Sequence, residues 1–448
     1  MNTSPAHLNR RDFIKTTGAT SASLTALAAM SGFVHAAHTD ELKVGLIGCG
    51  GRGTGAASQI LLSTDTPVRL WAMGDLFRDQ LDTSYDMLTQ GAQARYDRET
   101  FGSLSAKMTV PESRKFVGWN AYQEVLNSGV DIVILATPPQ FRPIQFEAAV
   151  AAGKHVFMEK PVAVDPAGIN RVLAAADVSK QKGLSVVAGT QRRHQKHYLE
   201  IMKRVQDGAI GEILGAHCYW NMGALWLEEA RRNWEAYQQK KWSDMEYQLR
   251  NWLFFTWLSG DHICEQHVHN LDIIHWALGT HPTAAMGIGG RAERTEPRYG
   301  NVFDHFSVEF EYENGIRLAS MCKQISKSTS HVCERLIGTK GTTYTDQANG
   351  YITGEHPYKF EGEERNPYYQ EHDDLIQSIR NAEPINEARQ VAISTMMAIL
   401  GRMSAYTGRA LKWNWATRSS KLDLTPPAYK FGPLKADPVA IPGQTALI

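Results

Sequence analysis

Short apolar runs alternate with helical segments over the first half of the chain. Four runs are continuous enough to be buried parallel strands, and they occupy residues 42–47, 68–74, 130–136 and 153–158. Residues 54–61 and 140–151, which lie between strands, have the composition and spacing of helices. The alternation predicts an α/β fold whose first domain is an open, doubly wound parallel sheet.

The second half of the chain shows strands in which apolar and polar residues alternate. These strands occupy residues 213–222, 305–312, 317–322 and 331–337. Asn314-Gly315 is a hairpin signal, and residues 369–381 and 388–406 are spaced as amphipathic helices. The pattern predicts an α+β domain with a mostly antiparallel open sheet, one face of which packs on helices while the other is free.

Length and charge restrict the possible functions. A chain of 448 residues normally forms two domains. Its 47 basic residues balance 47 acidic ones, so no net field would hold nucleic acid or an anionic membrane surface. The five cysteines lack CxxC spacing, which argues against a zinc site and a disulfide framework. A single disulfide between Cys322 and Cys333, which lie on neighbouring predicted strands, is one alternative. The other is that both are buried free thiols.

The N-terminal residues resemble a twin-arginine export signal. Arg10-Arg11 and Lys15 precede a weakly apolar stretch over residues 16–34, and small residues then suit cleavage near Ala36. The stretch is too polar for a stable transmembrane helix. We therefore expect a soluble mature protein, without stable membrane insertion, that is periplasmic or otherwise exported by this pathway. Folded export would suit an enzyme that takes up its cofactor in the cytoplasm.

A glycine-rich turn between the first strand and the first helix predicts a dinucleotide site. Residues 48–53 have the spacing GxGxxG, which allows a tight turn and lets backbone N–H groups approach a pyrophosphate. Asp75 ends the next strand about twenty residues later. A carboxylate at this place accepts hydrogen bonds from the ribose hydroxyls and repels a 2′-phosphate. NAD is therefore expected, and NADP is the less favoured alternative because Arg78 lies nearby. The expected contacts are Gly48, Gly50, Gly51, Arg52, Gly53 and Asp75.

Two further loops follow strands of the same sheet, at the edge where open α/β sheets bind ligands. Thr137-Pro138 follows the third strand and Glu159-Lys160-Pro161 the fourth. The GxGxxG domain and this EKP turn together resemble the glucose-fructose oxidoreductase, inositol dehydrogenase and rhizopine-catabolism (Gfo/Idh/MocA) family. The resemblance implies that Thr137, Pro138, Glu159 and Lys160 contact the cofactor, and that Pro161 is often cis. Lys160 would also stabilise negative charge developing on a substrate oxygen.

A histidine-rich segment resembles a second motif of that family, a helix with an aspartate and a histidine on one face. Gly260, His269 and Asp272 set the register, so Glu265 takes the place of the aspartate and His269 that of the histidine. Because residues four apart share a helix face, both are expected in one pocket. The resemblance implies that His269 is the general base and that Glu265 orients the substrate. His267, which replaces a family glycine, is a further substrate candidate.

No metal is expected, since no HExxH or similar spacing occurs. Glu265 and His269 could nevertheless share a cation.

Polar and aromatic residues of the second domain supply further candidates. Related proteins place a strand like residues 186–190 beside the nicotinamide, so Gln191 is expected to contact the cofactor and Arg192 the substrate. The alternative for both is a surface loop. Aromatic rings can stack on a sugar, and Arg or Asn can bond its hydroxyls. The candidates are Trp226, Arg250, Asn251 and Trp257, with core packing as the alternative.

These features divide the chain into four parts. We expect an export signal over residues 1–36, an NAD-binding Rossmann domain over 37–165, and a substrate-binding and oligomerisation domain over 166–420. Residues 421–448 form a proline-rich tail that cannot continue a helix. Because the open sheet of the family often pairs subunits, a homodimer or homotetramer is expected.

The combined reading favours an NAD-dependent oxidoreductase with tightly bound cofactor that acts on a CH–OH group of a sugar, glycoside or polyol. One alternative is a glycosidase that uses transient oxidation, elimination and addition of water, as relatives in this superfamily do. A second alternative is a sugar sensor without catalysis, which would be expected to lack Lys160 or His269.

Overall fold

The structure is a computed structural model, and it describes residues 41–63, 67–93 and 100–448. The expected export signal over residues 1–36 lies outside these residues. From Leu42 to Ile448 the described chain forms one unit, and this unit contains two large sheets.

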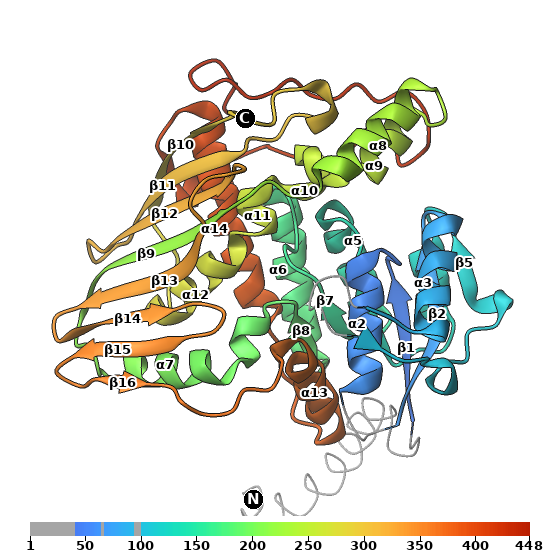
Figure 1. The fold of residues 1–448 in the computed structure, drawn as a ribbon, viewed down its shortest axis with the longest axis horizontal. Helices are drawn as coiled ribbons and strands as arrows, with labels where there is room; N and C mark the ends of the chain where they lie inside the picture. The colour runs from blue at the N-terminus through green and yellow to red at the C-terminus, as the bar shows by residue number, and fades with distance from the viewer. Residues whose placement is uncertain (1–40, 64–66, 94–99) are drawn as a thin grey trace, which may run out of the picture. The chain divides into compact units, whose positions relative to one another are not determined.

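The first sheet is parallel, with the strand order β5-β2-β1-β6-β7-β8 in the described residues. Its strands are β1 (Leu42–Ile47), β2 (Val68–Asp75), β5 (Lys115–Val117), β6 (Ile132–Leu135), β7 (His155–Met158) and β8 (Val186–Ala188). After β5 the chain crosses to β6, on the other side of β1. This order creates a crevice at the carboxyl ends of β1 and β6, the usual ligand position of such sheets. The predicted Rossmann-type sheet is confirmed (Figure 1).

This sheet extends beyond residue 165, where we placed the domain boundary. The helix α6 (Pro166–Gln181) leads into β8, which pairs with β7. Val186 also forms a bridge with Asn386, far along the chain. We recognised the strand near residue 186 but assigned it to the second domain, because a short apolar strand carries no mark of the sheet that it joins.

The second sheet has the order β16-β15-β14-β13-β9-β12-β11-β10-β17 and is mostly antiparallel, β9 and β12 being parallel neighbours. Its strands are β9 (Ile213–Met222), β10 (Ala284–Gly290), β11 (His305–Glu311), β12 (Arg317–Gln324), β13 (His331–Gly338), β14 (Gly341–Thr345), β15 (Gly350–Gly354), β16 (Tyr358–Lys359) and β17 (Leu411–Lys412). The predicted strands and the antiparallel pairing of β11 with β12 around Asn314-Gly315 are confirmed.

The order of these strands corrects the bridge that we left open between Cys322 and Cys333. Cys322 lies on β12 and Cys333 on β13, and β9 runs between them. All five cysteines are free and buried. Strands that are neighbours in sequence are not neighbours in this sheet, so the assumption behind the bridge fails.

The remaining elements of the described residues are helices and short strands. The longer helices are α2 (Gly51–Leu62), α3 (Arg78–Gln90), α4 (Ala121–Asn127), α5 (Arg142–Ala151), α7 (Lys196–Gln206), α8 (Leu227–Gln238), α9 (Asp244–Arg250), α12 (Val268–Leu278), α13 (Pro367–Arg380) and α14 (Ala388–Thr407). The shorter elements are α10 (Thr256–Ser259), α11 (His262–Glu265), α15 (Trp413–Arg418), β3 (Ala92–Gln93) and β4 (Thr100–Phe101). None of the described helices is both long and apolar enough to cross a bilayer.

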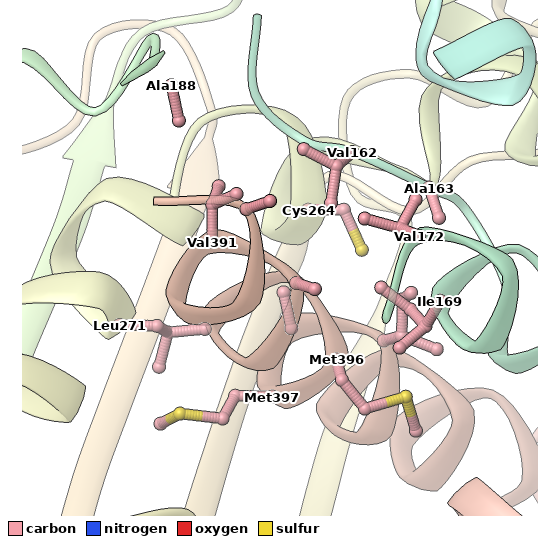
Figure 2. Packing of buried hydrophobic residues seen from close by; sticks show 14 of the residues in the cluster. Val162, Ala163, Ile169, Val172, Ala188, Cys264, Leu271, Val391, Met396 and Met397 are labelled. Carbon is pink, nitrogen blue, oxygen red and sulfur yellow. The ribbon is translucent and has the colours of Figure 1, made fainter. Parts of the chain in front are cut away.

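Helix α14 joins the two domains. It is buried along most of its length and packs on α6 of the first domain and on α12 and β10 of the second. Figure 2 shows Met396 on the side of Ile169 from α6, and Met397 on the side of Leu271 from α12. One continuous hydrophobic core therefore fixes the first sheet relative to the helices of the second domain.

We expect Gly53→Ala to destabilise the fold and Gly50→Ala to leave it unchanged. A Cβ on Gly53 would lie 1.9 Å from the backbone oxygen of Gly48, so the turn or α2 must shift, whereas a Cβ on Gly50 meets no atom within 4 Å. Urea unfolding without cofactor should show a loss of about 1–3 kcal/mol for Gly53→Ala. For Gly50→Ala the change should be at most about 0.5 kcal/mol. Equal losses would contradict this account of the turn.

Candidate functional site

A cleft opens at the carboxyl ends of β1, β2 and β6, where the strand order predicts a ligand. Its empty volume, including the part open to solvent, is about 1190 Å³. Elements of both domains line the cleft. The residues singled out from the sequence that line it are Gly48, Gly50, Gly51, Arg52, Asp75, Thr137, Pro138, Trp226 and Arg250.

The glycine turn has the geometry that a dinucleotide phosphate requires. Gly48 has φ +94°, a conformation that residues with a Cβ rarely adopt. The helix α2 starts at Gly51, and no side chain caps its N-terminus. Beside Gly50 the structure leaves open space where a Cβ would stand. Backbone N–H groups and the positive end of the helix dipole therefore face a space that a phosphate can occupy.

Asp75 is held at the end of β2 by two backbone groups. Its Oδ2 accepts a hydrogen bond from the N–H of Cys49 at 2.7 Å, and its Oδ1 accepts one from the N–H of Phe77 at 2.8 Å. Each carboxylate oxygen keeps a second lone pair for a ribose hydroxyl. Burial raises the pKa of Asp75 to about 6. Arg78, by contrast, pairs with Asp82 and Glu112 on the surface.

The side chain of Arg52 belongs to a buried ion-pair network. It pairs with Glu159 and, at 3.2 Å between Nη2 and Oε1, with Glu371 of α13. Glu159 therefore holds Arg52. We had expected Glu159 to contact the cofactor, but it does not line the cleft. Burial raises the pKa of Glu371 well above its usual range. The network links the glycine turn directly to the loop that carries Lys160.

Lys160 reaches across the domain boundary. It follows β7 in the first domain, and the Lys160–Pro161 peptide bond is cis. Its Nζ donates hydrogen bonds to the backbone oxygen of Glu265 and, at 3.1 Å, to the Oε1 of the same residue. Burial raises the pKa of Glu265, while the charge of Lys160 acts in the opposite direction. An ammonium and a carboxylate from different domains thus meet at one point.

Glu265 and His269 do not lie on one continuous helix, so our prediction of a shared helix face is wrong. Helix α11 ends at Glu265 and α12 begins at Val268. Between them, the Gln266 side chain bonds Glu265 and, at 2.9 Å, Gln324 of β12. These contacts with a neighbouring strand replace regular helix geometry, and sequence spacing does not reveal them.

His269 nevertheless lies within the electrostatic reach of Lys160. Burial and the positive charges of Lys160, Arg192 and Arg52 hold the pKa of His269 well below its usual range. Its ring stacks on Trp220 of β9, with 5.7 Å between the ring centroids. No described residue hydrogen-bonds its buried Nδ1. The ring is therefore neutral at pH 7, and one of its nitrogens is a hydrogen-bond acceptor.

Four candidates for substrate contacts lie in the protein core instead. The Nδ2 of Asn251 donates to the carbonyl of Arg298 at 2.9 Å, and the Nε1 of Trp257 donates to Gln248 at 2.8 Å. The other two have partners on the second sheet. His267 bonds Ser320 of β12 at 2.7 Å, and Arg192 pairs with Glu334 of β13 at 2.5 Å. All four side chains are buried and have polar partners in the core.

Gln191, expected at the cofactor, donates from its Nε2 to the hydroxyl of Tyr368 at 3.3 Å. It does not line the cleft, and neither do Gly53, Lys160, Glu265 and His269. Gly53 instead packs beneath the turn. Among the described residues, no group of three or more potential ligands is arranged to hold a metal ion, and the side chain of Glu265, which we considered as one ligand, is bound to Lys160.

Sequence reasoning missed an aromatic wall of the cleft. Its rings are Phe77, Trp119, Phe141 and Trp252. Phe141 could have been found, since it follows Thr137-Pro138 by a few residues on a loop of the ligand-binding edge. The other rings lie in segments that carry no motif, so no sequence signal separates them from core aromatics.

Two family models match the chain. The model described as the oxidoreductase family with an NAD-binding Rossmann fold matches residues 42–188. The model of the Gfo/Idh/MocA C-terminal domain matches residues 198–344. Together they span more than half of the sequence. The chain therefore belongs to the Gfo/Idh/MocA oxidoreductase family, and its first domain is an NAD-binding domain.

Individual relatives are more distant. The 2,7-anhydro-N-acetylneuraminate hydratase of Escherichia coli K12 is 30% identical over 193 residues, which is 43% of this chain and 45% of that protein. The chain thus spans less than half of that relative's length.

Two solved structures share the fold. A crystal structure of the Caulobacter crescentus aldose-aldose oxidoreductase with glycerol covers 83% of this chain and 99% of its own, at 20% identity and a TM-score of 0.62. The crystal structure of the scyllo-inositol dehydrogenase of Lactobacillus casei with NAD(H) and scyllo-inositol covers 83% of this chain and 99% of that enzyme's chain. The sequence identity is 19% and the TM-score is 0.59.

Proposed function

We propose that the protein is an NAD-dependent oxidoreductase that acts on a CH–OH group of a sugar, glycoside or polyol. The contact of Lys160 with Glu265 carries this proposal, because it places an ammonium of the nucleotide domain among the polar residues of the second domain. The names of the relatives support the substrate class, since they refer to inositols, an aldose and a sialic acid derivative.

The residues of the chain divide the work between two domains. The turn at Gly50 and Gly51 would hold the pyrophosphate and Asp75 the adenosine ribose. When bound, NAD supplies the hydride acceptor. Lys160 would donate to the reacting oxygen and stabilise its developing charge, and the neutral His269 would take its proton. Glu265 holds the ammonium in place and restricts its rotation.

A second candidate is a reaction without net oxidation. A hydratase adds water across a bond, and the E. coli relative carries that name. In such a scheme the substrate is oxidised at one carbon, which acidifies the neighbouring C–H. Elimination, addition of water and return of the hydride then restore the cofactor. The transient-redox glycosidase that we considered from the sequence follows the same steps, and the proton transfers would again involve Lys160 and His269.

We further propose that the open face of the second sheet forms a homodimer or homotetramer interface. Helices cover one face of this sheet, and in Figure 1 no described helix covers the other. That face exposes large apolar side chains, among them Met286, Ile288 and Met321, which are 61%, 73% and 44% exposed. Exposed apolar side chains on a sheet face are a feature of protein interfaces.

We also propose export by the twin-arginine pathway. The support is the order of residues in the sequence, namely Arg10-Arg11, the weakly apolar stretch and the cleavage-site residues Val34-His35-Ala36.

His269→Ala should lower kcat by about 10²–10⁴-fold, the usual contribution of a general base. The measurement is absorbance of NADH with inositols, aldoses and glycosides as substrates, and NAD affinity is determined in parallel. His275→Asn is the matched control, because His275 lies on the same helix and bonds the backbone of Thr280. Equal rates for His269→Ala and wild type would exclude the proposed base.

The wild-type kcat/KM should show no titration of His269 near pH 6.5, since the pKa of His269 is held well below that value.

Lasting reduction of NAD indicates a dehydrogenase. Transient reduction with release of an eliminated or hydrated product indicates the redox-neutral scheme. Neither signal with any substrate would leave only a binding role.

The double variant Met286→Lys/Ile288→Lys should convert an oligomer into a monomer, because two charges would be buried at the interface. Light scattering after size-exclusion chromatography gives the mass. Leu199→Lys, at an exposed position of α7 outside the sheet, should keep the wild-type mass. A wild-type monomer would disprove the interface.

Replacing Arg10-Arg11 with Lys-Lys should abolish export while the total amount of protein stays the same, because a receptor reads the arginine pair. Fractionation of cells that express either version measures the exported share. Unchanged export of the Lys-Lys version would rule out this pathway.

A further inference from the structure

The C-terminal tail contacts both walls of the cofactor cleft. Residues 424–434 lie outside the segments that the two family models match. In Figure 1 the tail, coloured red, runs along the top of the view past α8 and α9. We call residues 424–434 the strap.

On the first domain the strap packs against the aromatic wall of the cleft. Tyr429 lies 5.9 Å from Trp119 and 5.6 Å from Phe141, measured between ring centroids. Phe431 lies 5.4 Å from Trp119 and 5.9 Å from Phe77. These distances are typical of favourable aromatic pairs. Trp119, Phe141 and Phe77 line the cleft, so the strap contacts three of its rings.

The strap is also anchored to the first domain by polar contacts. The N–H of Leu424 donates to Asp165 Oδ2 at 2.7 Å, and Gln140 Nε2 donates to Thr425 at 3.3 Å. Gln140 lies in the loop after β6, at the edge of the cleft. The start of the strap is therefore tied to the nucleotide domain.

On the second domain the strap binds the start of α9. The N–H of Met245 donates to the carbonyl of Gly432 at 3.1 Å, and the N–H of Leu434 donates to Asp244 Oδ2 at 3.1 Å. Gln248 Nε2 donates to the carbonyl of Leu434 at 2.6 Å. Helix α9 carries Leu249 and Arg250, which line the cleft from the second domain.

A second connection joins the two walls at the end of the cleft near Asp75. Arg250 of α9 pairs with Asp79 of α3 at 2.9 Å, and its guanidinium lies 3.9 Å from the centroid of Phe77. The outer wall of the cleft is thus linked to the nucleotide domain at two places, by this ion pair and by the strap.

We propose that the strap is part of the cofactor site and retains the bound dinucleotide between turnovers. This inference rests on the proposed function, because it requires NAD in the cleft. An adenosine half bound between α9 and the aromatic wall would be released more easily when those walls separate. The strap resists that separation by holding both. A retained cofactor has to be returned to its starting oxidation state in place, which suits the redox-neutral candidate.

The test is the rate at which bound NADH leaves the full-length protein. Tyr429→Ala/Phe431→Ala should release it at least tenfold faster than wild type, measured by nucleotide fluorescence after mixing with excess NAD. Ile441→Ala is the matched control, since Ile441 lies in the same tail, is 51% exposed and makes no contact with the aromatic wall. An unchanged release rate in the double variant, or release within seconds from wild type, would overturn the proposal.

A second measurement uses only the wild-type protein, so it holds even if the double variant does not fold. If the strap favours NAD binding, NAD must stabilise the strap by the same factor. Hydrogen exchange of the Gly432 and Leu434 amides should therefore slow at least tenfold when NAD is added. Exchange that NAD does not change would disprove the coupling. Absence of any NAD binding would instead disprove the proposed function itself.

Discussion

The contact between Lys160 and Glu265 is the constraint around which the two domains are arranged. The ammonium comes from the end of β7 and the carboxylate from the end of α11, and both side chains are largely buried. Burying a charge without a partner destabilises the folded state by roughly several kcal/mol. Neither group therefore tolerates a shift of the domain that carries the other. The core around α14 prevents that shift, because this helix packs on α6 and α12 at once.

The same contact sets the electrostatics of the site. Burial and the positive charges of Lys160, Arg192 and Arg52 hold the pKa of His269 well below its usual range, and the ring is kept neutral. Arg192 and Arg52 are each paired with buried carboxylates, so their charges are fixed in position. Lys160, Glu265 and His269 do not line the cleft for the dinucleotide. The Arg52–Glu159 pair connects the glycine turn of the cleft to the EKP loop.

Local sequence signals predicted much of the fold and part of the site. The apolar runs that became β1, β2, β6 and β7 are buried on both faces, so their composition alone marks them. The glycine turn and Asp75 were predictable because their spacing follows from the length of one strand, helix and strand. By contrast, Asn251 and Trp257 were candidates only by residue type. They proved to be core residues, because burial depends on neighbours that are distant in sequence.

By itself, the sequence determined many of the strands and helices, where the dinucleotide turn lies, and which residue types were available for chemistry. These features depend on interactions within one helix or strand, or between it and the next element along the chain. Only the tertiary structure decided that Glu265 meets Lys160 next to a break between two helices, that β9 separates Cys322 from Cys333, and that residues 424–434 contact the aromatic wall of the cofactor cleft. Each of these features depends on chain segments that lie far apart in the sequence, and the hydrophobic periodicity of one segment does not show which other segment it contacts. The packing of the whole core decides these contacts.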